Sequence, residues 1–217
     1  MSTGLVIFMV SPFLDAAGGA GVVRRPGLTT PDDSYHGVTY AKEFGKAAYI
    51  TKATAQLMRD FGSTPAPISS WIMGMHLESL GVRMERHCAN AQKVAEWLAA
   101  DPRVSWVSYP GLENDKYHAL AQKYMPNGTC GVISFGVPGG RETVSAFLDH
   151  LKMVSIATHV ADARSCTLYP AGTTHRQLTE EQLEEAGVGI DLVRLSCGIE
   201  NADDIIADLK QAMDAVL

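Results

Sequence analysis

The 217-residue sequence has no block of basic residues. Its 18 lysines and arginines are scattered among 24 aspartates and glutamates, which gives a formal net charge of −6 at pH 7. Proteins that bind nucleic acid through its phosphates usually carry a basic patch or stripe. The composition therefore argues against a nucleic-acid partner.

Cysteine is scarce, and the four cysteines lie far apart without a CxxC pair. Such spacing is typical of neither a zinc site nor a disulfide framework, so we expect no metal centre. Isolated thiols suit a reducing compartment, and the sequence predicts a cytoplasmic protein. The four residues are Cys88, Cys130, Cys166 and Cys197.

Long apolar runs are absent as well. The one candidate, residues 5–10, is too short to span a bilayer and follows no basic segment, so neither a transmembrane helix nor a secretory signal is expected. We interpret it as a buried strand or an artefactual N-terminus. With 46% apolar and 19% charged residues, the composition is that of a soluble globular protein without a membrane partner.

Motifs that identify chemistry by spacing alone are also missing: the sequence has no HExxH, GxSxG or P-loop. A glycine-rich stretch at residues 18–21 precedes the basic pair Arg24 and Arg25 and could cradle a phosphate. Its spacing fits no phosphate-binding motif, so we favour a plain flexible loop. The seven histidines are interpreted as packed or surface residues rather than ligands or bases.

The first half of the chain has the apolar periodicity of helices. Residues 43–60 place apolar side chains on one stripe, and Gly62 follows as a stop signal. A second helix is expected to begin near Pro67, which suits a first turn. Its continuation over residues 81–100 predicts a long connecting helix that ends at Asp101.

The second half changes rhythm, to short strands that alternate with helices. One helix is expected over residues 141–153, one after a capping box formed by Thr179 and Gln182, and a last one with Asn201 as its N-cap. We therefore predict an α+β domain with a mostly antiparallel sheet covered by helices on one side. The candidate strands are residues 104–109, 131–136, 154–158, 163–169 and 192–197.

Several ordered motifs resemble one known family, that of the Cys/Met (transsulfuration) pyridoxal-phosphate enzymes, in its O-acetylhomoserine sulfhydrylase branch. The resemblance extends over about 190 residues from Pro26 onward, and it matches the C-terminal half of the family. The motifs that carry it are Pro26-Gly27-Leu28-Thr29, Ser34-Tyr35-His36-Gly37, Leu57-Met58-Arg59-Asp60, Glu78-Ser79-Leu80-Gly81-Val82-Arg83-Met84-Glu85-Arg86-His87, Asn90-Ala91, Tyr109-Pro110-Gly111-Leu112, Pro170-Ala171-Gly172-Thr173-Thr174-His175, and Leu192-Val193-Arg194-Leu195-Ser196-Cys197-Gly198-Ile199-Glu200.

The resemblance implies an α/β fold of type I, as in pyridoxal-phosphate-dependent transferases. On this basis residues 1–25 are an atypical N-terminal segment, residues 26–100 are the end of the large cofactor-binding domain with its connecting helix, and residues 101–217 are the C-terminal α+β domain. The implied activity is that of an O-acetylhomoserine sulfhydrylase (O-acetylhomoserine aminocarboxypropyltransferase) in methionine and cysteine biosynthesis, with pyridoxal phosphate as cofactor.

The resemblance also implies a site for the substrate carboxylate. In the family, the arginine that aligns with Arg194 pairs with the α-carboxylate, and a guanidinium fork suits that task because it stays charged and donates two parallel hydrogen bonds. The alternative is a structural ion pair, for example with Glu200. Ser165 keeps a small hydroxyl expected near the site.

The same region departs from the family's pattern at several positions. His159 stands where relatives have Ser or Asn as a second carboxylate contact, and Ala161 replaces a glycine, so we expect the loop to be reshaped. Cys166 and Tyr169 replace residues that are usually Leu and His. These changes, and their effect on the loop, put full activity in question.

The largest departure is the lack of the family's Schiff-base lysine segment. Thr51-Lys52 imitates it, but it lies in an amphipathic helix without the following glycines. We therefore predict that the chain alone does not bind the cofactor covalently and is inactive. It would act as a homo-oligomer or with a complementing N-terminal half; the alternative is a non-enzymatic module that binds substrate or forms an oligomer interface.

Overall fold

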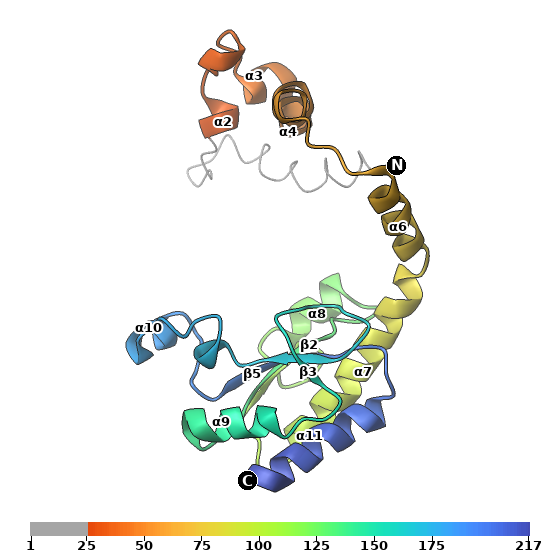
Figure 1. Cartoon of the computed structure of the whole chain (residues 1–217), viewed down its shortest axis with the longest axis vertical. Coiled ribbons are helices and arrows are strands. Elements are labelled where there is room, and N and C mark those ends of the chain that lie inside the picture. Colours follow the sequence, from red (N-terminus) through yellow and green to blue (C-terminus); the bar gives the residue numbers. More distant parts are fainter. Residues whose placement is uncertain (1–25) are drawn as a thin grey trace. The chain divides into compact units, whose positions relative to one another are not determined.

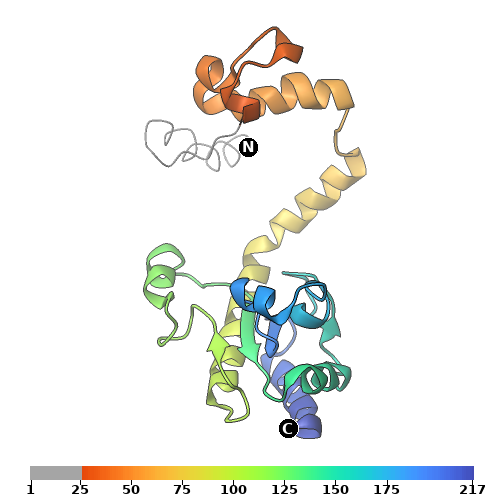
Figure 2. The ribbon, with the colours of Figure 1, turned by 90° about the vertical axis from the view of Figure 1, so that its left-hand side faces the viewer.

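A computed structural model describes residues 26–217, so the apolar run at residues 5–10 and the glycine-rich stretch lie outside the described part. The chain divides into two compact units between Met73 and Gly74, and each unit is described by itself (Figures 1 and 2). The division falls within a helix. The domain boundary that the sequence predicts near residue 100, where helices give way to strands, stays a prediction.

The first unit is built from short helices. These are α2 (Pro26–Thr29), η2 (Asp33–Tyr35), α3 (Tyr40–Phe44) and η3 (Gly45–Ala47), followed by α4 (Ala48–Lys52), η4 (Ala53–Met58) and α5 (Arg59–Phe61) in one continuous run. The helix predicted over residues 43–60 is therefore wrong at its start, because Gly45 adopts a φ of +50° and ends α3. Gly62 ends α5 with a φ of +67°, as the stop signal predicted.

Two consecutive helices follow: α6 (Pro67–Glu78) and α7 (Leu80–Ala100). The predicted long helix is confirmed, with a break at Ser79. The apolar stripe of α7 packs against β1, β2 and α11, so α7 belongs to the same compact unit as the sheet. Its buried residues recur at three- and four-residue spacing and are His87, Asn90, Ala91, Val94, Ala95 and Leu98.

The second unit contains one five-stranded sheet in the order β1-β2-β5-β4-β3. Every strand pair is antiparallel except β3 with β4, which confirms the predicted mostly antiparallel sheet. All five expected strands are present, though shorter than the sequence patterns. They are β1 (Val107–Ser108), β2 (Val132–Gly136), β3 (Ser155–Ile156), β4 (Cys166–Leu168) and β5 (Leu192–Ser196).

Three long helices cover one face of this sheet: α7, α9 (Gly140–Asp149) and α11 (Ala202–Val216) (Figure 1). Alternate residues of β2 and β5, such as Ile133 and Leu195, are fully buried between the sheet and the helices. The shorter α8 (His118–Tyr124), η5 (Pro170–Gly172) and α10 (Glu180–Glu185) lie in the connections. The capping box at Thr179 and the N-cap at Asn201 are both formed as predicted.

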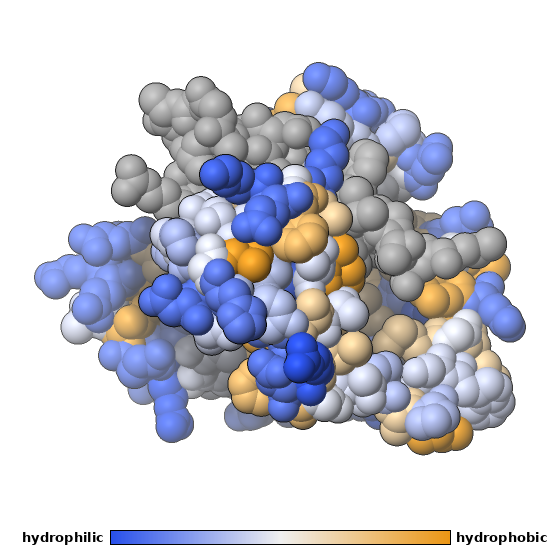
Figure 3. Space-filling view, turned by 90° about the horizontal axis from the view of Figure 1, so that it is seen from above, coloured by the Kyte–Doolittle hydropathy of each residue, from blue (hydrophilic) through white to orange (hydrophobic). Residues whose placement is uncertain are grey.

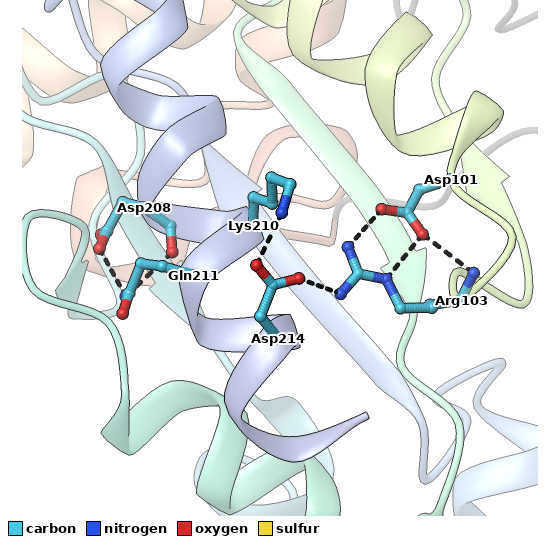
Figure 4. Close-up of polar contacts among 6 residues, drawn as sticks. All are labelled: Asp101, Arg103, Asp208, Lys210, Gln211 and Asp214. Atoms are coloured by element: carbon cyan, nitrogen blue, oxygen red, sulfur yellow. Dashed lines mark hydrogen bonds and ion pairs between the residues drawn. The ribbon is translucent and has the colours of Figure 1, made fainter.

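Polar side chains fasten α11 to its neighbours at two points (Figure 4). Arg103 forms a two-pronged pair with Asp101 at the end of α7, at 2.9 and 2.7 Å, and donates to Asp214 at 2.7 Å. Nearer to the N-terminus of α11, the carboxylate of Asp208 accepts the backbone N–H groups of residues 152–154 at 2.8 to 2.9 Å. Both contacts join segments that are far apart in the sequence.

Candidate functional site

Arg194 lies in β5, flanked by Ser134 of β2 and Leu168 of β4 in the sheet register. Its Nη2 donates to the main-chain carbonyl oxygens of Thr158 at 3.1 Å and of His159 at 3.4 Å. Both carbonyls belong to the loop between β3 and β4. The guanidinium group is therefore held along one side by neutral acceptors, which orient it and leave its charge uncompensated.

The alternative ion pair with Glu200 is not formed. Within residues 26–217, no carboxylate lies within ion-pair distance of Arg194, and its Nε is buried without a hydrogen-bond partner. Glu200 is engaged elsewhere, because it accepts the backbone N–H of Ser165 at 2.6 Å and the hydroxyl of Ser165 at 3.0 Å. Arg194 is only partly buried and pairs with no carboxylate of the described residues, so its guanidinium group can accept an anion from outside them.

Ser165 is fully buried, directly before β4. Its hydroxyl donates to Glu200 and accepts the N–H of Gly198 at 2.8 Å, so both roles of the hydroxyl are filled within the protein. Its direct contact with a substrate carboxylate stays a prediction. The geometry favours a supporting role, in which Ser165 fixes the loop beside Arg194.

His159 has an exposed side chain at the edge of the same loop. Its carbonyl oxygen accepts from Arg194 and from the thiol of Cys166 at 3.1 Å. The structure thus brings His159 to Arg194 through the main chain, while a contact of its imidazole with substrate stays a prediction.

Ala161 adopts a φ of +59°, in the left-handed region that glycine enters most easily. Its N–H donates to the Ser196 hydroxyl at 3.1 Å. The alanine thus occupies a glycine-type backbone conformation. The reshaping of the loop that we expected from this substitution stays a prediction.

The two other unusual residues near the site are packed inside the fold. Cys166 is buried in β4, and burial raises the pKa of its thiol. Tyr169 donates its hydroxyl to the carbonyl of Ile190 at 2.8 Å, and burial raises its pKa too. Burial also raises the pKa of Cys197, to about 12. A thiol with a raised pKa is a poor nucleophile, so neither Cys166 nor Cys197 is suited to act as one.

The described residues do not fit a covalently bound pyridoxal phosphate. Lys52, the one lysine in a Thr-Lys pair, forms a 2.6 Å ion pair with Asp32 and donates to the carbonyl of Gly27 at 2.8 Å. Its ammonium group also lies 5.0 Å from the ring centroid of Tyr40. These contacts occupy the ammonium group of Lys52 and hold the first unit together. In the same residues, no group of three or more potential ligands could hold a metal ion.

The sequence analysis predicted no site role for two residues that lie at the site, Thr158 and Asn90. The carbonyl of Thr158 carries no side-chain signal, because any residue would provide it. Asn90 of α7 donates from Nδ2 to the carbonyls of Gly198 at 2.9 Å and of Glu200 at 2.7 Å. A buried asparagine in the middle of a helix was the available signal, since such a side chain needs hydrogen-bond partners.

Comparison with known proteins agrees with this architecture. The sequence pattern of the family described as "Cys/Met metabolism PLP-dependent enzyme" matches residues 32–214. The chain is 40% identical over 190 residues to O-acetyl-L-homoserine sulfhydrylase 1 of Thermus thermophilus, and 43% identical over 195 residues to O-acetyl-L-homoserine sulfhydrylase of Leptospira meyeri. These matches cover 88% and 86% of this chain, but only 45% and 44% of the relatives.

Solved structures show the same relation. A putative O-acetylhomoserine (thiol)-lyase of Campylobacter jejuni, which carries a pyridoxyl-lysine, superposes with a TM-score of 0.76 at 38% identity. The alignment covers 90% of this chain and 46% of that one. An O-acetylhomoserine sulfhydrylase of Wolinella succinogenes superposes with a TM-score of 0.66 at 28% identity.

The chain spans about 45% of the length of the relatives that it matches. None of the helices within residues 26–217 is long and apolar enough to cross a membrane. The resemblance predicted from the motifs is confirmed, together with the type I fold that it implied. The chain belongs to the Cys/Met metabolism family of pyridoxal-phosphate-dependent enzymes.

Proposed function

We propose that this chain forms the C-terminal part of a pyridoxal-phosphate-dependent O-acetylhomoserine sulfhydrylase, and that its direct task is to bind the α-carboxylate of the amino-acid substrate through Arg194. One observation carries the proposal. The guanidinium of Arg194 is oriented by two main-chain carbonyls, and no carboxylate within residues 26–217 neutralises it.

A guanidinium beside two carbonyls keeps its positive charge, because neutral acceptors orient it without cancelling it. Its remaining N–H groups can then grip a carboxylate in a charge-assisted, two-pronged contact. The rest of the substrate, including its α-amino group, would extend away from Arg194 toward the reacting centre, which the described residues do not form.

The chemistry would then depend on the cofactor-lysine half of the enzyme. That half would belong to the same polypeptide or to a complementing chain, and assembly as a homo-oligomer is part of the proposal. The chain by itself would be inactive, which is supported by the engagement of Lys52 with Asp32. We also propose a cytoplasmic location, supported by the four cysteines, which are all free thiols.

A second function is favoured by particular residues near Arg194. Ser165 is fully bonded within the protein, and His159 replaces the smaller side chain of relatives. A non-enzymatic module that binds a substrate carboxylate, or forms an oligomer interface, would tolerate both features. This function predicts carboxylate binding or assembly without turnover in any complex.

Reconstitution distinguishes the two functions. The chain would be mixed with the cofactor-lysine half of the Leptospira meyeri sulfhydrylase, and homocysteine formation from O-acetylhomoserine and sulfide would be measured. We expect turnover with the wild-type chain, and a loss of roughly 100-fold or more in kcat/KM with Arg194→Ala, about 2.7 kcal/mol. Arg194→Lys keeps the charge without the fork and should recover only part of this loss. A reconstituted complex that is indifferent to Arg194→Ala would contradict the proposal.

A further inference from the structure

The side chain of Glu200 makes a charged contact between the segment that follows β5 and the segment that precedes β4. The two carboxylate oxygens of Glu200 accept from the backbone N–H and the hydroxyl of Ser165 at 2.6 and 3.0 Å. The same hydroxyl accepts the N–H of Gly198 at 2.8 Å. Hydrogen bonds to a carboxylate are stronger than those between neutral groups, so this is the firmest contact between the two segments.

A side chain of α7 completes the junction from the other direction. Asn90 is almost fully buried, and its Nδ2 donates to the carbonyls of Gly198 and Glu200. The space between these groups is closed. A Cβ atom at Gly198 would collide with the carboxylate of Glu200 and would lie 2.5 Å from the carbonyl oxygen of Ala163. Position 198 therefore has room only for glycine in this arrangement, and the hydrogen bonds from Asn90 hold the main chain of Gly198 and Glu200 in place.

The fastened loop supplies the acceptors of Arg194. Residues 157–165 carry the carbonyls of Thr158 and His159, and three neutral contacts join them to the end of β5 and the residues after it. The N–H of Ala161 donates to the Ser196 hydroxyl, the N–H of Ile199 donates to the carbonyl of Ala163 at 2.9 Å, and the N–H of Gly198 donates to the Ser165 hydroxyl. The contact of Glu200 with Ser165 is the charged one of the set. Loss of this contact would loosen the loop at the end nearest to β4.

We infer that Glu200 is a positioning residue for the carboxylate grip of Arg194: through Ser165 it holds the loop whose carbonyls set the direction of the guanidinium. This rests on the proposed function of Arg194. The carboxylate of Glu200 is itself satisfied by Ser165, so it fixes the site without pairing with the arginine. Glu200, the last residue of the Arg-x-Ser-x-Gly-Ile-Glu motif, would thus act on a group six residues earlier in the same motif.

The inference can be tested on the whole chain by following the side-chain Nε–Hε signals of arginine in NMR spectra. The signal of Arg194 is assigned by its absence in Arg194→Lys, and O-acetyl-L-homoserine is the titrated probe. For Glu200→Ala we expect a displaced Arg194 signal and binding weakened about 10-fold, because the loop is released. Glu200→Gln should bind better than Glu200→Ala, since an amide oxygen can still accept the N–H of Ser165.

Asp208→Asn is the matched control, because it weakens another buried junction of the same unit without touching this loop. It should leave the Arg194 signal and the affinity for the probe unchanged. If Arg194→Lys removes binding while both Glu200 variants bind like the wild type, the inference fails and the proposed function stands. If the wild type gives no saturable shift, or Arg194→Lys binds equally well, the proposed function fails and the inference with it.

Discussion

At the scale of single residues, Asp208 shows how one buried charge can organise a loop. It is 6% exposed, and its carboxylate accepts three consecutive backbone N–H groups of residues 152–154. Asp208→Ala would leave these donors unsatisfied in the interior. We expect it to lower the free energy of unfolding by about 3 kcal/mol, measured by urea denaturation. Exposed Asp203→Ala, on the same helix, serves as the control and should cost about 1 kcal/mol or less; equal losses would contradict the assignment.

The same residue predicts a pH dependence of stability. Burial acts to raise the pKa of Asp208, but the three backbone hydrogen bonds outweigh it, and the pKa is lowered below its ordinary value of 3.8. A lowered pKa means that the folded state prefers the carboxylate. The stabilisation is therefore complete above about pH 4 and is lost as the pH falls through the lowered pKa. Denaturation curves from pH 6 to pH 2 should show a smaller acid-induced loss for Asp208→Asn than for the wild type; parallel curves would exclude this source.

Ala161 gives a prediction about backbone strain. An L-residue in the left-handed region costs roughly 1–2 kcal/mol, whereas glycine enters it freely but loses about 0.4–1 kcal/mol through the entropy of the unfolded chain. Ala161→Gly should therefore be neutral or stabilising by up to about 1 kcal/mol in thermal denaturation. Ala163→Gly, in the same loop but without a positive φ, should destabilise. Equal effects of the two substitutions on thermal stability would contradict the backbone strain assigned to Ala161.

At the scale of elements, α6 is unusual because none of its twelve residues is buried. Its large apolar side chains are 44% to 61% exposed and point in several directions around the helix: Ile68, Trp71, Ile72, Met73, Met75 and Leu77. Apolar side chains also reach the surface among hydrophilic ones in the view of Figure 3. A helix that is apolar on all sides is typical of a protein interior, so we expect α6 to be covered in the assembled protein.

The element therefore predicts self-association. Analytical ultracentrifugation of the isolated chain should show a dimer, a larger oligomer or aggregation. Trp71→Lys with Met75→Lys, which lie one turn apart on α6, should reduce it by adding charge to one face. Tyr124→Lys, an exposed aromatic residue at the end of α8, is the control and should not. A wild-type chain that stays monomeric at high concentration would contradict this prediction.

At the scale of the whole molecule, the chain matches about 45% of the length of its relatives, and the described residues do not form the covalent cofactor site. We expect no stoichiometric covalent binding of pyridoxal phosphate by the isolated chain. Borohydride reduction followed by peptide mass analysis checks this, with the reconstituted complex as the positive control. Labelling of a single lysine at one cofactor per chain would contradict this prediction. The variant Lys52→Arg would then show whether Lys52 is the labelled residue.

Sequence patterns accounted for elements whose cause is local. The capping box at Thr179, the N-cap at Asn201 and the stripe of α7 each depend on residues within one or two turns of each other. The start of the helix predicted over residues 43–60 was wrong for a local reason too, because the apolar periodicity continues across Gly45 while the helical backbone does not. Helix α8 was not predicted, since its one buried residue, Ala121, gives little periodicity.

The sequence alone determined the family, the order of the five strands and, apart from α8, the main helices of the second unit, because ordered motifs and periodicity are properties of the chain itself. The role of Arg194 as a carboxylate ligand stays a prediction. Only the tertiary structure decided what surrounds Arg194. The carbonyls of Thr158 and His159 and the junction of Asn90, Ser165 and Glu200 come from segments up to 110 residues apart. Hydrogen bonds between such segments depend on how the strands pair and how α7 packs, which no local pattern records.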